Sequence, residues 1–369
     1  MRTRNLTLAV SGLLVAALTA GCGGALPSSS NGQADATYAQ IAKLPKDQQR
    51  AKAKELAKQE GNILSLYTSM TADIATPIAN AFEKATGIHV SVFRGNSETV
   101  LQRTMQEEGA KRPGADAVET NFLEMTALSD NGFLVDYNGS ALDKVEPTGK
   151  FAHWTASRLN IFQPAWNTSL IKPGMEPTSW EDLALPKYKG KITLEVSDSD
   201  WFENVTKYWL SHGKTQAQVD ALWKAIVANS KVAKGHTTMM QFLTAGQTPM
   251  EAMNYTYITD RAAEKGAPVA HLPANKKSTV PAFGRPNGVG MIKGAQHPAA
   301  AWLFYDWLLT DGQKVLVDQG LTPSTKVPGD KSLDGITLVP FDVKGLSEKN
   351  GNWDKKYDEL LRGVATVGK

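Results

Sequence analysis

The chain has 369 residues, of which 41% are hydrophobic and 21% are charged, and its formal net charge is +3. This length allows two lobes with separate cores, and the composition is ordinary for a folded soluble protein. Arg2 and Arg4 contribute two of the positive charges, so the rest of the chain carries only +1. A strongly basic surface is therefore not expected, which argues against nucleic acid as a partner.

The N-terminus has the pattern of an export signal. Arg2 and Arg4 precede an apolar run from Leu6 to Ala20, and small residues lead into Cys22. At roughly 15 residues the run is too short for a comfortable membrane span. Cys22 is the only cysteine, so no intramolecular disulfide can form.

The segment Leu18-Thr19-Ala20-Gly21-Cys22 closely resembles a bacterial lipobox. This resemblance implies a lipoprotein signal peptide over residues 1–21 and a lipid on Cys22, although Cys22 could also be a chance cysteine after an ordinary signal peptide. A lipid there would hold the protein at a membrane surface, facing the periplasm or the cell exterior. Residues 22–60 are predicted to form a Gly- and Ser-rich tether and then a solvated surface helix.

Residues 61–98 predict a strand, a helix and a second strand joined by short turns. The apolar run Ile63–Tyr67 has the length of a strand, and residues 74–85 carry an apolar face at helical spacing. Gly87 ends the helix, and residues 88–93 alternate as the next strand. With a third short strand at residues 115–119, the pattern indicates a parallel α/β sheet.

Polar residues follow these three strands, and open α/β sheets bind ligands beyond the carboxyl ends of their strands. The candidate ligand-binding residues of this lobe are Tyr67, Thr68, Ser69, Asn96, Ser97, Glu119 and Asn121. Simple roles remain open for them: Thr68 and Ser69 also suit turns, and Ser97 also suits the N-cap of a helix over residues 98–108. Glu119 could meet a cation, an amine or a metal, or it could lie exposed in a loop.

The second half of the chain contains further strand and helix signals. Residues 151–170 are aromatic and extended, a strand is predicted at 192–196, and residues 250–258 are strand-like. No HExxH, GxSxG or GxxxxGK[ST] motif is present, so we expect a protein that is not an enzyme.

Three segments together resemble the type 2 periplasmic solute-binding proteins of ABC importers, in the branch that contains ferric-ion, thiamine and phosphonate binders. They are Leu64–Gly87 with its Tyr-Thr-Ser turn, Pro177–Ile192 and Gly288–Gln313. The resemblance implies an α/β fold of two lobes, joined by two crossover strands that form a hinge and close on a small ligand. It places residues 61–162 and 285–369 in lobe 1 and residues 163–284 in lobe 2. It also implies that the receptor is a monomer and that its partner is an ABC permease.

The resemblance also suggests residues of the second lobe that meet the ligand. These candidates are Trp166, Asn167, Asn254, Tyr255, Tyr257 and Arg261. In ferric-binding relatives a pair of neighbouring tyrosines supplies metal ligands, and Tyr255 and Tyr257 would share one face if both lay on a strand. They could equally pack or line a cleft for another ligand. Arg261 and Arg285 could each bind a carboxylate, phosphonate or carbonate anion, or each could form an ordinary surface salt bridge.

The ligand therefore stays open between ferric iron, as cargo, and a small organic ion such as a phosphonate, thiamine or a polyamine. Three departures weaken the assignment of ferric iron as the ligand: Thr256 separates the two tyrosines, Met70 stands where many iron binders have His or Tyr, and Trp166 replaces a crossover Tyr. Two other functions compete with a lipid-anchored receptor. One is a surface interaction or sensory lipoprotein that has kept the binding fold, and the other is a secreted hydrolase.

Overall fold

The computed structural model describes residues 30–339 and 341–368. The predicted signal peptide and the lipidation site Cys22 lie outside the described residues. Within the described part of the chain, no helix is long and apolar enough to cross a membrane.

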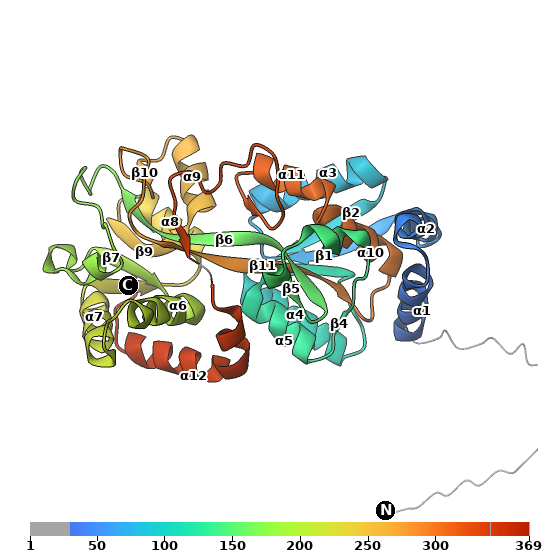
Figure 1. The fold of residues 1–369 in the computed structure, drawn as a ribbon, viewed down its shortest axis with the longest axis horizontal. Coiled ribbons are helices and arrows are strands. Elements are labelled where there is room, and N and C mark those ends of the chain that lie inside the picture. Colours follow the sequence, from blue (N-terminus) through green and yellow to red (C-terminus); the bar gives the residue numbers. More distant parts are fainter. Residues whose placement is uncertain (1–29, 340, 369) are drawn as a thin grey trace, which may run out of the picture.

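Two α/β lobes lie side by side and are joined by two long strands (Figure 1). The main strands follow the order β2-β1-β3-β11-β6-β9-β7-β8. The central pair, β6 (Trp154–Asn167) and β11 (Ala282–Ile292), is antiparallel. β11 pairs with β3 in the first lobe, and β6 pairs with β9 in the second. The predicted two-lobed fold with crossing strands is confirmed.

The first lobe begins with the predicted strand–helix repeats. Its elements are β1 (Ile63–Thr68), α3 (Ala72–Thr86), β2 (His89–Arg94), α4 (Ser97–Gly109), β3 (Ala117–Asn121) and α5 (Phe122–Asp130). Helix α3 buries Ile74, Ile78 and Phe82 in one stripe and ends at Gly87, whose φ of 73° favours glycine. Because β1 pairs parallel with both β2 and β3, the carboxyl ends of all three strands meet at one edge.

The chain returns to the first lobe after β11. This part contains α10 (Pro298–Leu308), α11 (Asp311–Asp318) and the short strands β12 (Thr322–Pro323) and β13 (Leu338–Val339). Two other short strands, β4 (Leu134–Val135) and β5 (Lys150–Phe151), pair with β11 and β6. Every residue of α10 is buried, so this helix is the centre of the lobe's helical layer.

The N-terminal helices differ from the prediction of a tether and a solvated helix. Residues 30–59 form α1 (Ser30–Ala42) and α2 (Lys46–Gln59), and both pack against α10. Ala53 and Ala57 are fully buried, and the Tyr38 hydroxyl donates to the Ile292 carbonyl at 3.0 Å. Small alanine side chains let α2 approach α10 closely, so this segment belongs to the core of the first lobe.

The second lobe repeats the parallel arrangement. Its elements are β7 (Ile192–Glu195), α6 (Ser199–Ser211), α7 (Gln216–Ala228), β8 (Ser230–Ala233), α8 (His236–Thr244), β9 (Met250–Tyr255), α9 (Thr256–Glu264) and β10 (Val269–Ala270). β7 pairs parallel with β8 and β9, so their carboxyl ends also meet at one edge.

The C-terminal segment was expected in the first lobe, but it packs on the second. Helix α12 (Val343–Leu361) lies against α6 and α7 (Figure 1). The Tyr357 hydroxyl donates to the Glu195 carbonyl at 2.8 Å, and Thr366 forms a bridge with Val232 in β8. Tyr357 is buried and its ring stacks on Phe202 of α6, and these contacts hold the C-terminal segment on the second lobe. The remaining lobe boundaries stay a prediction.

Gly288 leaves room for the indole ring of Trp154 against strand β11. The register between β11 and β6 shifts at Asn287 and Gly288, and the indole of Trp154 covers the glycine. A Cβ at position 288 would lie 2.1 Å from Trp154 Cε3, so only glycine fits without a movement of the ring.

Candidate functional site

A cavity of about 240 Å³ lies between the lobes, at the carboxyl ends of the parallel strands of both sheets. Its first-lobe lining comes from the carboxyl ends of β2 and β3 and from the turns and helix starts that follow β1, β2 and β3: Ser69, Thr71, Arg94, Asn96, Ser97, Glu98, Asn121, Leu123 and Glu124. Its second-lobe lining follows β7, β8 and β9 and comprises Glu195, Ser197, Asp198, residues 234–238, Tyr255, Tyr257 and Ile258. The crossing strands add Arg158, Asn160 and Arg285. The predicted location of the site, at the strand ends, is therefore the location of the cavity.

Helix N-termini from both lobes face this cavity. The residues preceding α3, α4, α5, α6, α8 and α9 all line it, and they are Thr71, Asn96, Asn121, Asp198, Gly235 and Tyr255. Of these six, only Asn96 accepts a capping hydrogen bond with its side chain, from Thr99 N at 2.8 Å. The sequence had suggested Ser97 for this role, but Ser97 is already the first helical residue. Uncapped helix N-termini present N–H groups and partial positive charge, which suits an anion.

Most cations of the cavity are already paired with carboxylates. Arg158 Nε lies 3.0 Å from Glu119, and Lys234 Nζ lies 2.6 Å from Glu98 across the gap between the lobes. Arg94 is different: its Nε donates to a backbone carbonyl, and it forms no ion pair within residues 30–339 and 341–368. Its two terminal nitrogens are therefore available to a ligand.

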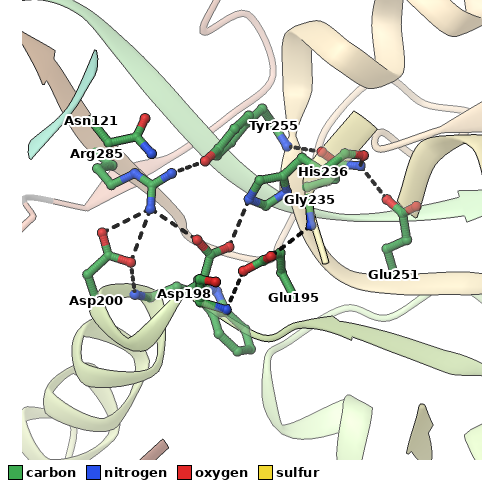
Figure 2. Close-up of polar contacts among 12 residues, drawn as sticks. Asn121, Glu195, Asp198, Asp200, Gly235, His236, Glu251, Tyr255 and Arg285 are labelled. Atoms are coloured by element: carbon green, nitrogen blue, oxygen red, sulfur yellow. Dashed lines mark hydrogen bonds and ion pairs between the residues drawn. The ribbon is translucent and has the colours of Figure 1, made fainter. Parts of the chain in front are cut away.

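Arg285 is the centre of a buried polar network on the second-lobe side (Figure 2). Its Nη1 donates to Asp198 at 3.1 Å and to both oxygens of Asp200 at 3.2 and 3.0 Å, and its Nη2 donates to the Tyr255 hydroxyl. His236 Nε2 lies 2.8 Å from the other Asp198 oxygen. Burial opposes charge on Asp198, but the charges of His236 and Arg285 outweigh it and lower the pKa of Asp198.

Two carboxyl groups of the cavity titrate near neutrality. Burial, reinforced by the Asp198 charge, raises the pKa of Glu195 to about 7, although the backbone N–H groups of Gly235 and Ser197 both donate to it. Burial also raises the pKa of Glu124 to about 7. Near pH 7 these groups exist both protonated and ionised, so they can donate a hydrogen bond to a ligand or accept one.

The structure brings about half of the predicted site residues together. Those that line the cavity are Ser69, Asn96, Ser97, Asn121, Tyr255 and Tyr257. Those that do not line it are Tyr67, Thr68, Glu119, Trp166, Asn167, Asn254 and Arg261.

The first-lobe residues outside the lining have structural partners. The Tyr67 hydroxyl donates to Glu107 on α4, at 3.1 and 3.0 Å from its two oxygens. Thr68 donates to Glu119 at 2.7 Å, and Glu119 is fully buried rather than exposed in a loop. Glu119 instead fixes Arg158, which does line the cavity.

The second-lobe residues outside the lining are also held by the protein. Trp166 is buried on β6 beside β9 and β10, and Asn167 donates to the Leu243 carbonyl at 2.9 Å. The Asn254 amide donates to Glu251 at 2.5 Å and to the His236 carbonyl at 3.3 Å.

Arg261 lies at a neighbouring cavity of about 470 Å³, which shares five lining residues with the first: Thr71, Arg94, Thr237, Tyr257 and Ile258. There it contacts Asp73 of the first lobe at 3.0 Å.

Tyr255 and Tyr257 both reach the cavity, but not by the predicted route. β9 ends at Tyr255 and α9 begins at Thr256, so the two side chains do not alternate along a strand. Their rings are nearly parallel, with centroids 6.0 Å apart. Tyr255 accepts from Arg285, whereas burial raises the pKa of Tyr257 and thereby opposes its phenolate form. Within the described residues, no group of three or more His, Cys, Asp or Glu side chains is placed to hold a metal ion.

Sequence reasoning missed the charged residues that dominate the cavity. Asp198 and His236 each follow a strand of the second lobe, so the strand-end rule could have found them. Arg158 had no such signal, because it lies inside a long crossing strand. Arg285 was considered as an anion-binding residue, but here carboxylates already occupy it.

Residues 77–330 match the family described as bacterial extracellular solute-binding protein. The chain belongs to this family. It is a type 2 solute-binding protein of ABC importers and resembles the Fe(3+)-binding periplasmic protein of Serratia marcescens, with 26% identity over 68% of this chain and 75% of the relative. A Salmonella typhi periplasmic protein named for binding 2-aminoethylphosphonate is 22% identical over 74% of this chain and 81% of its own length. The resemblance seen in the sequence is confirmed.

Among solved structures, the periplasmic binding protein AfuA from Actinobacillus pleuropneumoniae, with fructose-6-phosphate bound, has the same fold. The TM-score is 0.68 at 21% identity, and the alignment covers 82% of this chain and 99% of AfuA. The solute-binding protein described here is thus an extracytoplasmic receptor that takes a small ligand between its lobes and works with an ABC permease.

Proposed function

We propose that this solute-binding protein captures a small organic anion carrying a phosphate or phosphonate group. Arg94 and the uncapped N-termini of α3, α5 and α8 carry the proposal, because they offer positive charge and N–H donors around one cavity. The relative named for 2-aminoethylphosphonate and the fructose-6-phosphate complex of AfuA are consistent with this chemistry.

The remainder of the ligand would carry hydroxyl or amino groups. Glu124, Glu195 and Asn121 present acceptors and donors on opposite walls of the cavity, which suit such groups better than an apolar substituent. Ser69, Asn96, Ser97 and Tyr257 complete the proposed binding set.

Ferric iron is the second candidate ligand, with Tyr255 and Tyr257 as its protein ligands. Both phenol-bearing residues line the cavity, and the relative from Serratia marcescens is named for binding Fe(3+). Phenolate oxygens are hard ligands suited to a hard cation.

The proposal extends to the setting of the receptor. A lipid on Cys22 would anchor a monomeric receptor outside the cytoplasm, and the protein would deliver its ligand unchanged rather than act as an enzyme. Metabolic labelling with a palmitate analogue tests the anchor: loss of the label in Cys22→Ala supports it, and unchanged labelling contradicts it.

Isothermal titration of the purified protein with 2-aminoethylphosphonate, fructose 6-phosphate, inorganic phosphate, thiamine and spermidine tests the ligand class. A charge-assisted contact contributes about 1.5–3 kcal/mol, so Arg94→Gln should weaken binding of a phosphate or phosphonate ester roughly 10- to 100-fold. Arg112→Gln, a change of an exposed arginine outside the cavity, is the matched control. If no phosphorus-containing ligand binds, or if Arg94→Gln binds one equally well, the proposal fails.

A further inference from the structure

The oxygen atoms around Arg285 are of the kinds that hard metal ions prefer as ligands. Asp198, Asp200 and Tyr255 direct four oxygens at one guanidinium, three from carboxylates and one from a phenol. Figure 2 shows these oxygens converging on Arg285 from the start of α6 and the end of β9. Hard cations prefer this donor set, but in this protein a side chain supplies the positive charge.

Arg285 is also fixed in place. It lies on the crossing strand β11, its backbone pairs with Asn160 of β6, and it is 3% exposed. Its guanidinium carbon lies 4.8 Å from the ring centre of Phe162 and 5.3 Å from that of Tyr255. The hydrogen bonds of its two Nη atoms and these aromatic faces hold the guanidinium in this position.

We infer that Arg285 is the resident cation of this site and thereby selects against a metal ligand. This inference rests on the proposed function and sharpens it, because the Tyr255 hydroxyl, which already binds Arg285, is then not available as an iron ligand. A ferric ion binding to Tyr255 would have to displace a guanidinium that already occupies the phenol oxygen and both neighbouring carboxylates. It would also meet the repulsion of that positive charge.

The same arrangement explains why the anion-binding groups lie elsewhere in the cavity. The charge of Arg285 is compensated by Asp198 and Asp200, so Arg285 attracts a ligand anion less than Arg94 does. The ligand's anionic group then belongs near Arg94 and the helix N-termini, while Arg285 keeps the second-lobe wall rigid and closed to metal ions.

Titration with ferric nitrilotriacetate, followed by visible absorbance, tests this inference, since iron bound to a phenolate gives a charge-transfer band. We expect no band in the unmodified protein and a band in Arg285→Gln, which removes the cation and keeps the carboxylates. The band should disappear in the double variant Arg285→Gln/Tyr255→Phe. Arg285→Lys, which keeps a positive charge, and Arg158→Gln, which removes a different buried arginine of the cavity, should both stay colourless.

Two results would overturn the inference. One is a band in the unmodified protein that Tyr255→Phe abolishes, and the other is a folded Arg285→Gln, judged by circular dichroism, that gives no band. If Arg285→Gln does not fold, the unmodified protein decides alone: a Tyr255-dependent band contradicts the inference, and no band at excess iron supports it. Binding of phosphate and phosphonate esters is measured separately by calorimetry, so failure of the proposed function and failure of this inference give different results.

Discussion

The side chain of Arg261 on α9 binds both the carboxylate and the backbone carbonyl of Asp73 on α3. Arg261 Nε lies 3.0 Å from the Asp73 carboxylate, and Nη2 lies 3.2 Å from the Asp73 carbonyl oxygen. That carbonyl is free because the residue four positions later is Pro77, which has no N–H to donate. A proline inside a first-lobe helix thus creates an acceptor for an arginine of the second lobe, and the contact ties the lobes together beside the cavity.

We expect Asp73→Asn to speed ligand release. The pair joins the two lobes, so weakening it destabilises the closed arrangement that holds the ligand. Because both side chains are partly exposed, the pair contributes roughly 0.5–1 kcal/mol, which corresponds to dissociation about 2- to 5-fold faster. Stopped-flow measurement checks this. Lys314→Gln, which breaks a surface pair within α11, is the control, and equal rates for both variants would contradict the role of Asp73.

A second contact between the lobes involves Glu98 of α4, which accepts from Lys234 at 2.6 Å and from Ser197 at 2.8 Å. In a double-mutant cycle of Glu98→Gln and Lys234→Gln, the effects on ligand affinity should be non-additive by roughly 0.5–1 kcal/mol. The coupling should shrink at high salt, because charges at the cavity edge are screened. Additive effects at low salt would show that the pair does not support closure.

Glu251 should make the protein less stable as the pH rises. Burial raises the pKa of Glu251 from 4.5 to about 8, and its one hydrogen-bond donor in the described structure is Asn254. The folded state therefore binds this proton more tightly than the unfolded state, so stability is retained below about pH 4.5 and lost as the pH rises toward 8.

Glu251→Gln removes this titration. Urea unfolding at pH 5 and pH 8 should show the variant gaining stability relative to the unmodified protein at the higher pH. The gain is on the order of 1.4 kcal/mol for each pKa unit spanned. A constant difference between the two proteins across this range would contradict the assignment.

Gly288→Ala should destabilise the pairing of the crossing strands β6 and β11. Its Cβ would lie 2.1 Å from Trp154 Cε3, so the ring or the strand must move, at a cost of about 1–3 kcal/mol. Thermal unfolding measures the loss. Gly109→Ala, at a helical position with open space around its Cβ, should be neutral or slightly stabilising. A melting temperature for Gly288→Ala equal to that of Gly109→Ala would refute the steric argument.

The sequence alone predicted the strand–helix repeats and the edge of the sheet where the cavity lies, and the family resemblance added the crossing strands. The repeats and the edge follow from local patterns: the apolar spacing of α3, the stop at Gly87, and polar residues directly after each strand. The apolar spacing that forms a helix or a strand is contained in a short stretch of sequence. Residues 61–98 are therefore enough to predict the first strand–helix–strand unit.

The tertiary structure decided which polar side chains reach the cavity. Tyr67 and Glu119 satisfy the strand-end pattern, yet Tyr67 binds Glu107 and Glu119 binds Arg158, and neither lines the cavity. Arg158, in contrast, lines the cavity from a position within a strand. Tyr255 lines the cavity as predicted, but its hydroxyl is bound by Arg285, which lies 30 residues later in the chain. Buried charges and hydroxyls need partners, and these partners come from distant segments that only the folded chain brings together.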